Sequence, residues 1–194
     1  MNKEDTPPSS GLPVKTIGHG TRALEEFLSI LKSEGVQRVV DVRSIPRSRH
    51  NPQFNSDTLR SALGSEGILY TPMLSLGGLR PPLKNSQNGA WKNKSFRGFA
   101  DYMQTEAFQD AVKELEDMSR NQTIVLLCAE TLPWRCHRSL IADALTVRGH
   151  RVEEILRKDH RQPHRLTPWA HVGGGRLSYP PVSESPPGDT TPPA

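Results

Sequence analysis

Residues 14–43 alternate between a strand pattern and a helix pattern, and this alternation limits the possible folds more than any other feature of the chain. Residues 14–18 are a short, mainly apolar run, which is typical of a strand. Between residues 24 and 31 the apolar side chains recur at i, i+3, i+4 and i+7, which indicates a helix that Gly35 is expected to end. Residues 38–43 again indicate a strand. A strand, a helix and a strand with short connections form a right-handed βαβ unit, which predicts a parallel sheet.

The same alternation continues to residue 156. We expect further helices before Gly67, at 96–103, after Thr105 and at 139–148, and further strands at 68–70, 123–128 and 152–156. The sequence therefore predicts a single three-layer α/β domain, residues 14–156, with a mainly parallel sheet of about five strands. Residues 72–95 have no regular period but contain cations and Trp91, which predicts either a functional loop or a flexible insertion.

The two ends of the chain differ from this domain in composition. Residues 1–13 and 157–194 are rich in Pro, Gly, Ser, Thr and charge without periodicity, so we expect both segments to be largely disordered. The first residues lack the apolar core of a signal peptide, and no run reaches membrane-spanning length, so a cytoplasmic protein without a membrane partner is expected. The net charge of +4 is compatible with an anionic ligand but falls short of the footprint of a dedicated nucleic-acid binder.

Both cysteines of the chain lie in residues 123–138, which read as strand, loop and helix. Cys128 and Glu130 are expected at the carboxyl end of the strand, where open α/β sheets bind ligands. Cys136 and His137 are expected at the helix start, where backbone N–H groups favour thiolates and anions. A catalytic site of Cys128, Glu130, Cys136 and His137 is therefore predicted, with a cysteine as nucleophile and Glu130 or His137 moving protons. Packing of the cysteines in the core is the simpler alternative.

Charged side chains from other parts of the chain are expected at the same edge of the sheet. His19 and Asp41 follow the first two predicted strands, Arg43 and Arg47 come just after the second, and Arg138 lies at the last helix start. Guanidinium groups grip phosphates and carboxylates, so these residues predict a site for a small anionic substrate, such as a nucleotide-like one. In the alternative hypothesis the same arginines contact nucleic acid or a protein partner, and the cysteines are structural.

The spacing of these residues bears on two further kinds of chemistry. Cysteine phosphatases place five residues between the cysteine and the arginine, whereas six separate Cys128 from Arg135, and Pro133 has no N–H for a phosphate cradle. A metal could be held by Cys128, Glu130, Cys136 and His137, with His19 as a further ligand, because the ligand types fit. The spacing matches no common zinc finger or ribbon, so a metal is possible but not favoured, and no cofactor is expected.

Four stretches of the chain occur in the same order as in a known family. TIGHG at residues 16–20, VDVRSIPRSR at 40–49, LGG at 76–78 and LLCAETLPWRCHR at 126–138 resemble the family called domain of unknown function 488. The resemblance covers residues 14–156 and implies a small cytoplasmic α/β protein, without naming a reaction. The matching positions are His19, Asp41, Arg43, Pro46, Glu130, Cys136, His137 and Arg138. Many family members carry serine where this chain has Gly20.

Overall fold

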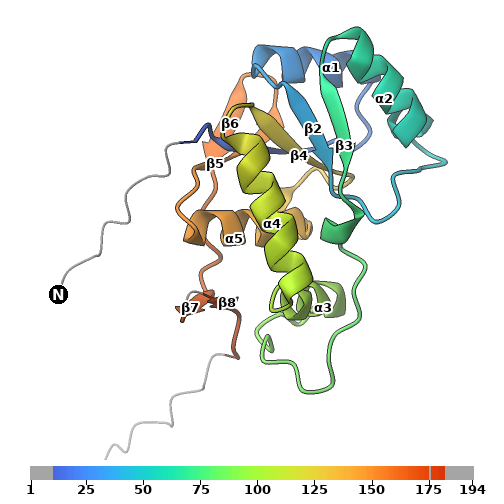
Figure 1. Ribbon diagram of the computed structural model, residues 1–194. Helices are drawn as coiled ribbons and strands as arrows, with labels where there is room; N and C mark the ends of the chain where they lie inside the picture. Colours follow the sequence, from blue (N-terminus) through green and yellow to red (C-terminus); the bar gives the residue numbers. More distant parts are fainter. Residues whose placement is uncertain (1–10, 175, 182–194) are drawn as a thin grey trace, which may run out of the picture.

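The structure is a computed structural model and describes residues 11–174 and 176–181 (Figure 1). Within these residues, six strands form one sheet in the order β3-β2-β4-β1-β5-β6, and all neighbours are parallel except β5 and β6. The strands are β1 (Val14–Gly18), β2 (Arg38–Asp41), β3 (Leu69–Pro72), β4 (Ile124–Cys128), β5 (Val152–Arg157) and β6 (His160–Pro163). The predicted α/β class and the mainly parallel sheet are confirmed, with one strand more than the five expected.

Helices cover both faces of the sheet and complete the three layers. The side chains of α1 (Leu24–Ser33) and α2 (Ser56–Ser65) form the core on one face. On the other face the core is formed by α3 (Lys94–Tyr102), α4 (Glu106–Ser119) and α5 (Arg138–Val147), and α4 crosses in front of the sheet in Figure 1. Successive strand residues point to opposite faces, so Cys128 of β4 packs on the same side as α5.

Local signals explain where the helices begin and end. Thr105 accepts a hydrogen bond from the Phe108 N–H and begins α4 as predicted. Gly35 and Gly67 adopt positive φ just after α1 and α2, and so terminate these helices. The helix α1 begins after Ala23, which provides no side-chain cap.

The strand order creates a crevice between β1 and β4. These two strands are adjacent and level, since Gly18 pairs with Cys128 at their carboxyl ends. The chain leaves β1 toward α1 on one face and leaves β4 toward α5 on the other. Diverging connections of this kind open a crevice at the carboxyl edge of a sheet, which is the usual ligand position in this fold class.

Residues 157–174 and 176–181 differ from the prediction of a largely disordered tail. They add β6 to the sheet and form a small hairpin of β7 (His171–Gly173) and β8 (Arg176–Ser178). Polar contacts attach them: His164 lies between Asp143 and Glu154 at 2.8 and 2.7 Å, and the Tyr179 hydroxyl donates to Asp143. This segment is attached by a few buried contacts and has no regular apolar pattern. Its sequence therefore resembles that of a disordered tail. The predictions for residues 1–10 and 182–194 lie outside the described residues.

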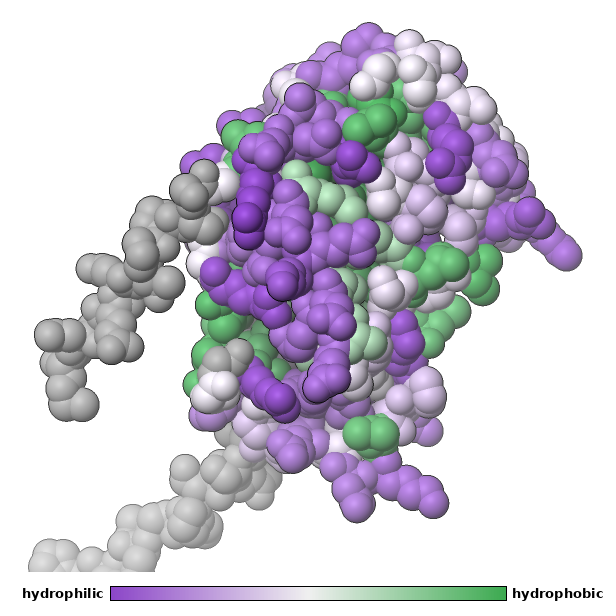
Figure 2. All heavy atoms as spheres, in the orientation of Figure 1, coloured by the Kyte–Doolittle hydropathy of each residue, from purple (hydrophilic) through white to green (hydrophobic). Residues whose placement is uncertain are grey.

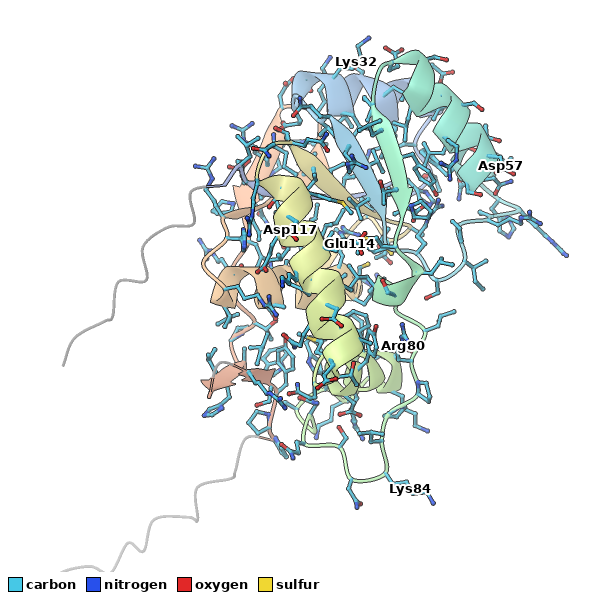
Figure 3. All side chains as sticks on the ribbon, viewed as in Figure 1. Lys32, Asp57, Arg80, Lys84, Glu114 and Asp117 are labelled. Carbon is cyan, nitrogen blue, oxygen red and sulfur yellow. The ribbon has the colours of Figure 1, made fainter. Side chains whose placement is uncertain are left out.

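The stretch between η2 (Leu74–Leu76) and α3 is an irregular loop that is hydrogen bonded to one carboxylate of α3. Buried Asp101 accepts hydrogen bonds from the Leu83 N–H, the Ser86 hydroxyl and the Asn88 amide. Lys84 lies at the outer bend of the loop and points away from the molecule in Figure 3. These bonds fix the loop against α3, which argues against a merely flexible insertion.

The face crossed by α4 is mainly hydrophilic, as Figure 2 shows. Glu114 and Asp117 of α4 are exposed on this side (Figure 3). Helices of the described residues are all too short or too polar to cross a membrane.

Candidate functional site

Two adjoining hollows lie at the carboxyl ends of β1, β2 and β4. The first, which we call the Cys–His cavity, has a volume of about 340 Å³ and is lined by Cys128, Glu130, Arg135, Cys136 and His137 together with Leu79 and Phe96. The second, which we call the His19 hollow, has a volume of about 520 Å³ and is lined by His19, Arg47 and Thr131 among others. Arg43, Ile45, Ala129 and Glu130 line both, so the two hollows form one cleft at the predicted edge of the sheet.

The two thiols and one imidazole form a compact cluster on the wall of the Cys–His cavity. His137 Nδ1 lies 4.0 Å from Cys128 Sγ and 3.8 Å from Cys136 Sγ. Cys128 comes from the end of β4, and Cys136 and His137 come from the turn just before α5. The strand, loop and helix thus bring together three of the four residues predicted to be catalytic, although their chemical role stays a prediction.

The orientation of the His137 ring is fixed by its surroundings. Nε2 lies 3.1 Å from the Val42 carbonyl oxygen and 3.0 Å from the Leu76 carbonyl oxygen. Carbonyl oxygens only accept hydrogen bonds, so Nε2 carries a ring proton, and Nδ1 is the ring nitrogen that faces the sulfurs. Phe99 packs edge-on to the ring, and Gly78 lies so close that an added Cβ would be 2.4 Å from Nδ1.

The two thiols differ in acidity. A hydrogen bond from the Cys128 thiol and the nearby Arg138 guanidinium lower the pKa of Cys136 to about 7, against the opposing effect of burial. The same hydrogen bond to Cys136, together with burial, raises the pKa of Cys128 above its ordinary value. Cys136 is therefore the cysteine that the site favours as a thiolate, in agreement with its position before the N-terminus of α5.

Glu130 lies where the two hollows meet. Its carboxylate accepts a hydrogen bond from the Leu132 N–H at 3.1 Å. The chain around it packs tightly on β1, because a Cβ at Gly18 would be 1.9 Å from the Glu130 carbonyl oxygen. Gly20 has φ +54°, and a Cβ there would be 2.3 Å from Thr131 Oγ1, which accounts for glycine at this position in this chain.

Arg138 is buried beneath this loop and does not reach the cleft. It is 1% exposed, and its guanidinium donates to the carbonyl oxygens of Glu130 and Thr131. Neither hollow is lined by it. These contacts suit a residue that holds the 129–135 loop in place, whereas the sequence suggested direct binding of an anion.

His19, Asp41 and Arg43 meet as predicted, but they contact one another. The Arg43 guanidinium donates to both carboxylate oxygens of Asp41 and to the Phe54 carbonyl oxygen, and its Nη1 lies 3.3 Å from His19 Nε2. Burial and the Arg43 charge lower the pKa of His19 to about 4, so this imidazole is neutral at pH 7. The network shapes the wall between the hollows, and its predicted role in binding an anion stays a prediction.

The accessible cations of the cleft are Arg47 and Arg135. Arg47 is exposed on the rim of the His19 hollow, and Arg135 is exposed on the rim of the Cys–His cavity. The sequence drew attention to Arg135 only through the comparison with cysteine phosphatases, and it gave no indication that Gly78, Leu79 and Phe96 line the cavity. Gly78 belongs to the LGG stretch, which is one of the four stretches shared with the family. Nothing in the sequence places that loop next to His137.

A third hollow lies on the other side of the η3 turn (Pro133–Arg135). It has a volume of about 620 Å³, and its lining includes Trp91, Trp134 and Trp169, the three tryptophans of the chain. The rings of Trp91 and Trp169 meet edge to face at 5.3 Å. Trp134 lines this hollow while its neighbour Arg135 lines the Cys–His cavity, so η3 separates the two.

The model of one protein family, described as Domain of unknown function DUF488, matches residues 23–145. The chain belongs to this family. The DUF488 match agrees with the resemblance seen in the four sequence stretches, and it includes the Cys–His cluster and Arg43 but not His19. No curated protein and no solved structure matches the chain.

Proposed function

We propose that this DUF488 protein is an enzyme that acts on a small anionic substrate in the cleft at the carboxyl ends of β1, β2 and β4. The observation that supports this most is the convergence of two thiols, an imidazole and the Glu130 carboxylate on one cavity. Groups that can attack, move protons and bind an anion are the usual composition of an active site at this position of an α/β sheet.

The residues divide naturally by their chemistry. Glu130 carries protons between the substrate and solvent, because it lies where the two hollows meet. Arg47 and Arg135 hold anionic groups of the substrate, because their guanidinium groups are accessible on the two rims. The cluster of Cys128, Cys136 and His137 supplies the reacting groups, and Leu79 and Phe96 add apolar surface to the lining of the cavity.

Burial of the other cations favours this enzyme over a nucleic-acid-binding module. A phosphate-binding surface needs several accessible cations on one face. Arg43 and Arg138 are 5% and 1% exposed, and their guanidinium groups are already hydrogen bonded within the protein. The exposed Arg47 and Arg135 suit a small ligand better than a long polyanion.

Turnover assays on the full chain test the proposal. A panel of phosphate monoesters, phosphate diesters, nucleotides and carboxylic amides is incubated with the protein, and product release is measured. Glu130→Gln should lower kcat by about 100- to 10,000-fold, because it removes a proton carrier. Arg135→Ala should mainly raise KM.

The matched control is Arg120→Ala, since Arg120 is exposed at the end of α4 and pairs only with Asp117 among the contacts described. Its kinetics should equal those of the parent protein. Full activity in the Glu130→Gln variant would refute the assignment of the cleft as the active site.

A further inference from the structure

Cys128 Sγ, Cys136 Sγ and His137 Nδ1 form a triangle of soft ligand atoms that all lie within 4.8 Å of one another. The two sulfur–nitrogen distances are 4.0 and 3.8 Å. A tetrahedral zinc ion with its usual bond lengths holds sulfur and nitrogen ligands about 3.6 Å apart. The triangle therefore needs only small side-chain movements to close around an ion.

The imidazole already has the orientation and the support that a metal ligand requires. Nδ1 faces the sulfurs, while the Nε2 proton is held by the carbonyl oxygens of Val42 and Leu76. Histidines that bind metals commonly donate their second ring N–H to a carbonyl or carboxylate in this way. The contacts with Phe99 and Gly78 leave the ring little freedom to turn.

We propose that Cys128, Cys136 and His137 bind a zinc ion whose fourth position faces the Cys–His cavity. Thiolate and imidazole ligands favour zinc over hard cations such as magnesium or calcium. Binding converts the two thiols to thiolates and releases their protons, and the two negative charges balance the ion.

The ligand number indicates an open site. Among the described residues, the triangle has three members, and the Glu130 carboxylate is hydrogen bonded to the Leu132 N–H nearby without belonging to it. Structural zinc sites have four protein ligands, whereas catalytic sites have three and keep a position for water or substrate. Since all three residues line the Cys–His cavity, the side of the ion opposite them faces that cavity.

The open position suggests how the ion serves the reaction, a step that rests on the proposed function. A zinc ion held by these three residues would supply a water molecule whose pKa is lowered to about 7, which would serve as the attacking group of a hydrolysis. Glu130 would take the proton of the attacking water and would give it to the leaving group as the bond to that group breaks, so protons and bonds balance.

Metal analysis of the full chain, without an affinity tag and purified in reducing buffer without chelator, tests the site directly. We expect about one zinc ion per chain. After removal of zinc, titration with cobalt(II) should produce a thiolate-to-cobalt charge-transfer band and the intense visible bands of four-coordinate cobalt. A reduced protein that retains no zinc and gives no such bands overturns the proposal.

Variants locate the ligands. Cys128→Ser, Cys136→Ser and His137→Gln should each lower the zinc content and the affinity for cobalt at least tenfold, with folding checked by circular dichroism. His171→Gln is the matched control, because His171 is exposed on β7, and it should bind metal as the parent protein does. Undiminished affinity in Cys136→Ser overturns the assignment. Because the cobalt spectrum of the parent protein also reports sulfur ligation, the test does not depend on any variant folding.

Glu130→Gln separates the two proposals. It should keep the zinc ion while it loses turnover. A protein that binds zinc at these residues but shows no activity contradicts only the proposed function, whereas an active protein that binds no metal contradicts only the zinc site.

Discussion

Gly78 packs against the His137 ring, and the absence of a side chain at this position leaves room for the imidazole. A Cβ at this position would be 2.4 Å from Nδ1 and 2.6 Å from Cγ. Gly78→Ala should therefore displace the ring from Cys128 and Cys136, and we expect at least tenfold weaker binding of cobalt, measured by spectroscopic titration.

Gly64→Ala is the control for this substitution, because Gly64 lies in α2 with nothing within 4 Å of an added Cβ. It should leave cobalt binding unchanged and raise the free energy of unfolding by about 0.4–1 kcal/mol. Equal cobalt affinity in both variants would contradict the role given to Gly78.

The residues of the site differ in how well the sequence predicted them. Cys128, Cys136 and His137 were predicted to meet, because one strand, one loop and one helix start bring them to the same edge. The burial of Arg138 was not predicted, since a sequence does not show whether a guanidinium points into the protein or toward solvent. Gly78 was missed because its contact with His137 joins segments about 60 residues apart in a loop without a period.

At the scale of elements, the segment after β5 is attached by a buried group that titrates. Burial opposes protonation of His164, but the carboxylates of Asp143 on α5 and Glu154 on β5 outweigh it and raise its pKa to about 9. The unfolded chain has the ordinary pKa of about 6.5. The resulting stabilisation is therefore complete below pH 6.5 and is lost as the pH rises through 9.

Chemical denaturation of the parent protein and of His164→Gln between pH 6 and 10 measures this effect. At pH 6 the variant should be less stable by about 3–5 kcal/mol, because two buried carboxylates lose their cationic partner. The difference should shrink toward pH 10. Parallel stability curves for the two proteins would show that His164 carries no charge in the folded state.

The elements themselves follow local patterns to different degrees. Short apolar runs and the period of 3.6 residues, together with Gly35, Gly67 and Thr105, identified the parallel strands and the helices. The strand β6 and the hairpin of β7 and β8 were missed, because they expose most of their side chains. The order in which β4 lies between β1 and β2 could not be predicted either, since it depends on contacts between distant segments.

For the whole molecule, the domain is longer than its sequence pattern suggests. A chain that ends at residue 156 loses β6, which pairs with β5, and also loses His164 and Tyr179, both of which contact Asp143. We expect this truncated chain to unfold at a clearly lower temperature or to aggregate, since it exposes a sheet edge and leaves buried carboxylates unpaired.

A chain that ends at residue 181 keeps these contacts and is the matched control. It should stay soluble and unfold in one cooperative transition, as followed by circular dichroism. If the chain ending at residue 156 were equally stable, residues 157–181 would be an appendage to the domain and not a part of it.

The grouping of Trp91, Trp134 and Trp169 around one hollow gives the protein an optical reporter. Every indole of the chain senses the same neighbourhood, and Trp134 lies two residues before Cys136. Ultraviolet emission from the unlabelled protein will thus register events on either side of η3, so that the arrival of an ion or a small molecule can be followed in real time without an attached dye.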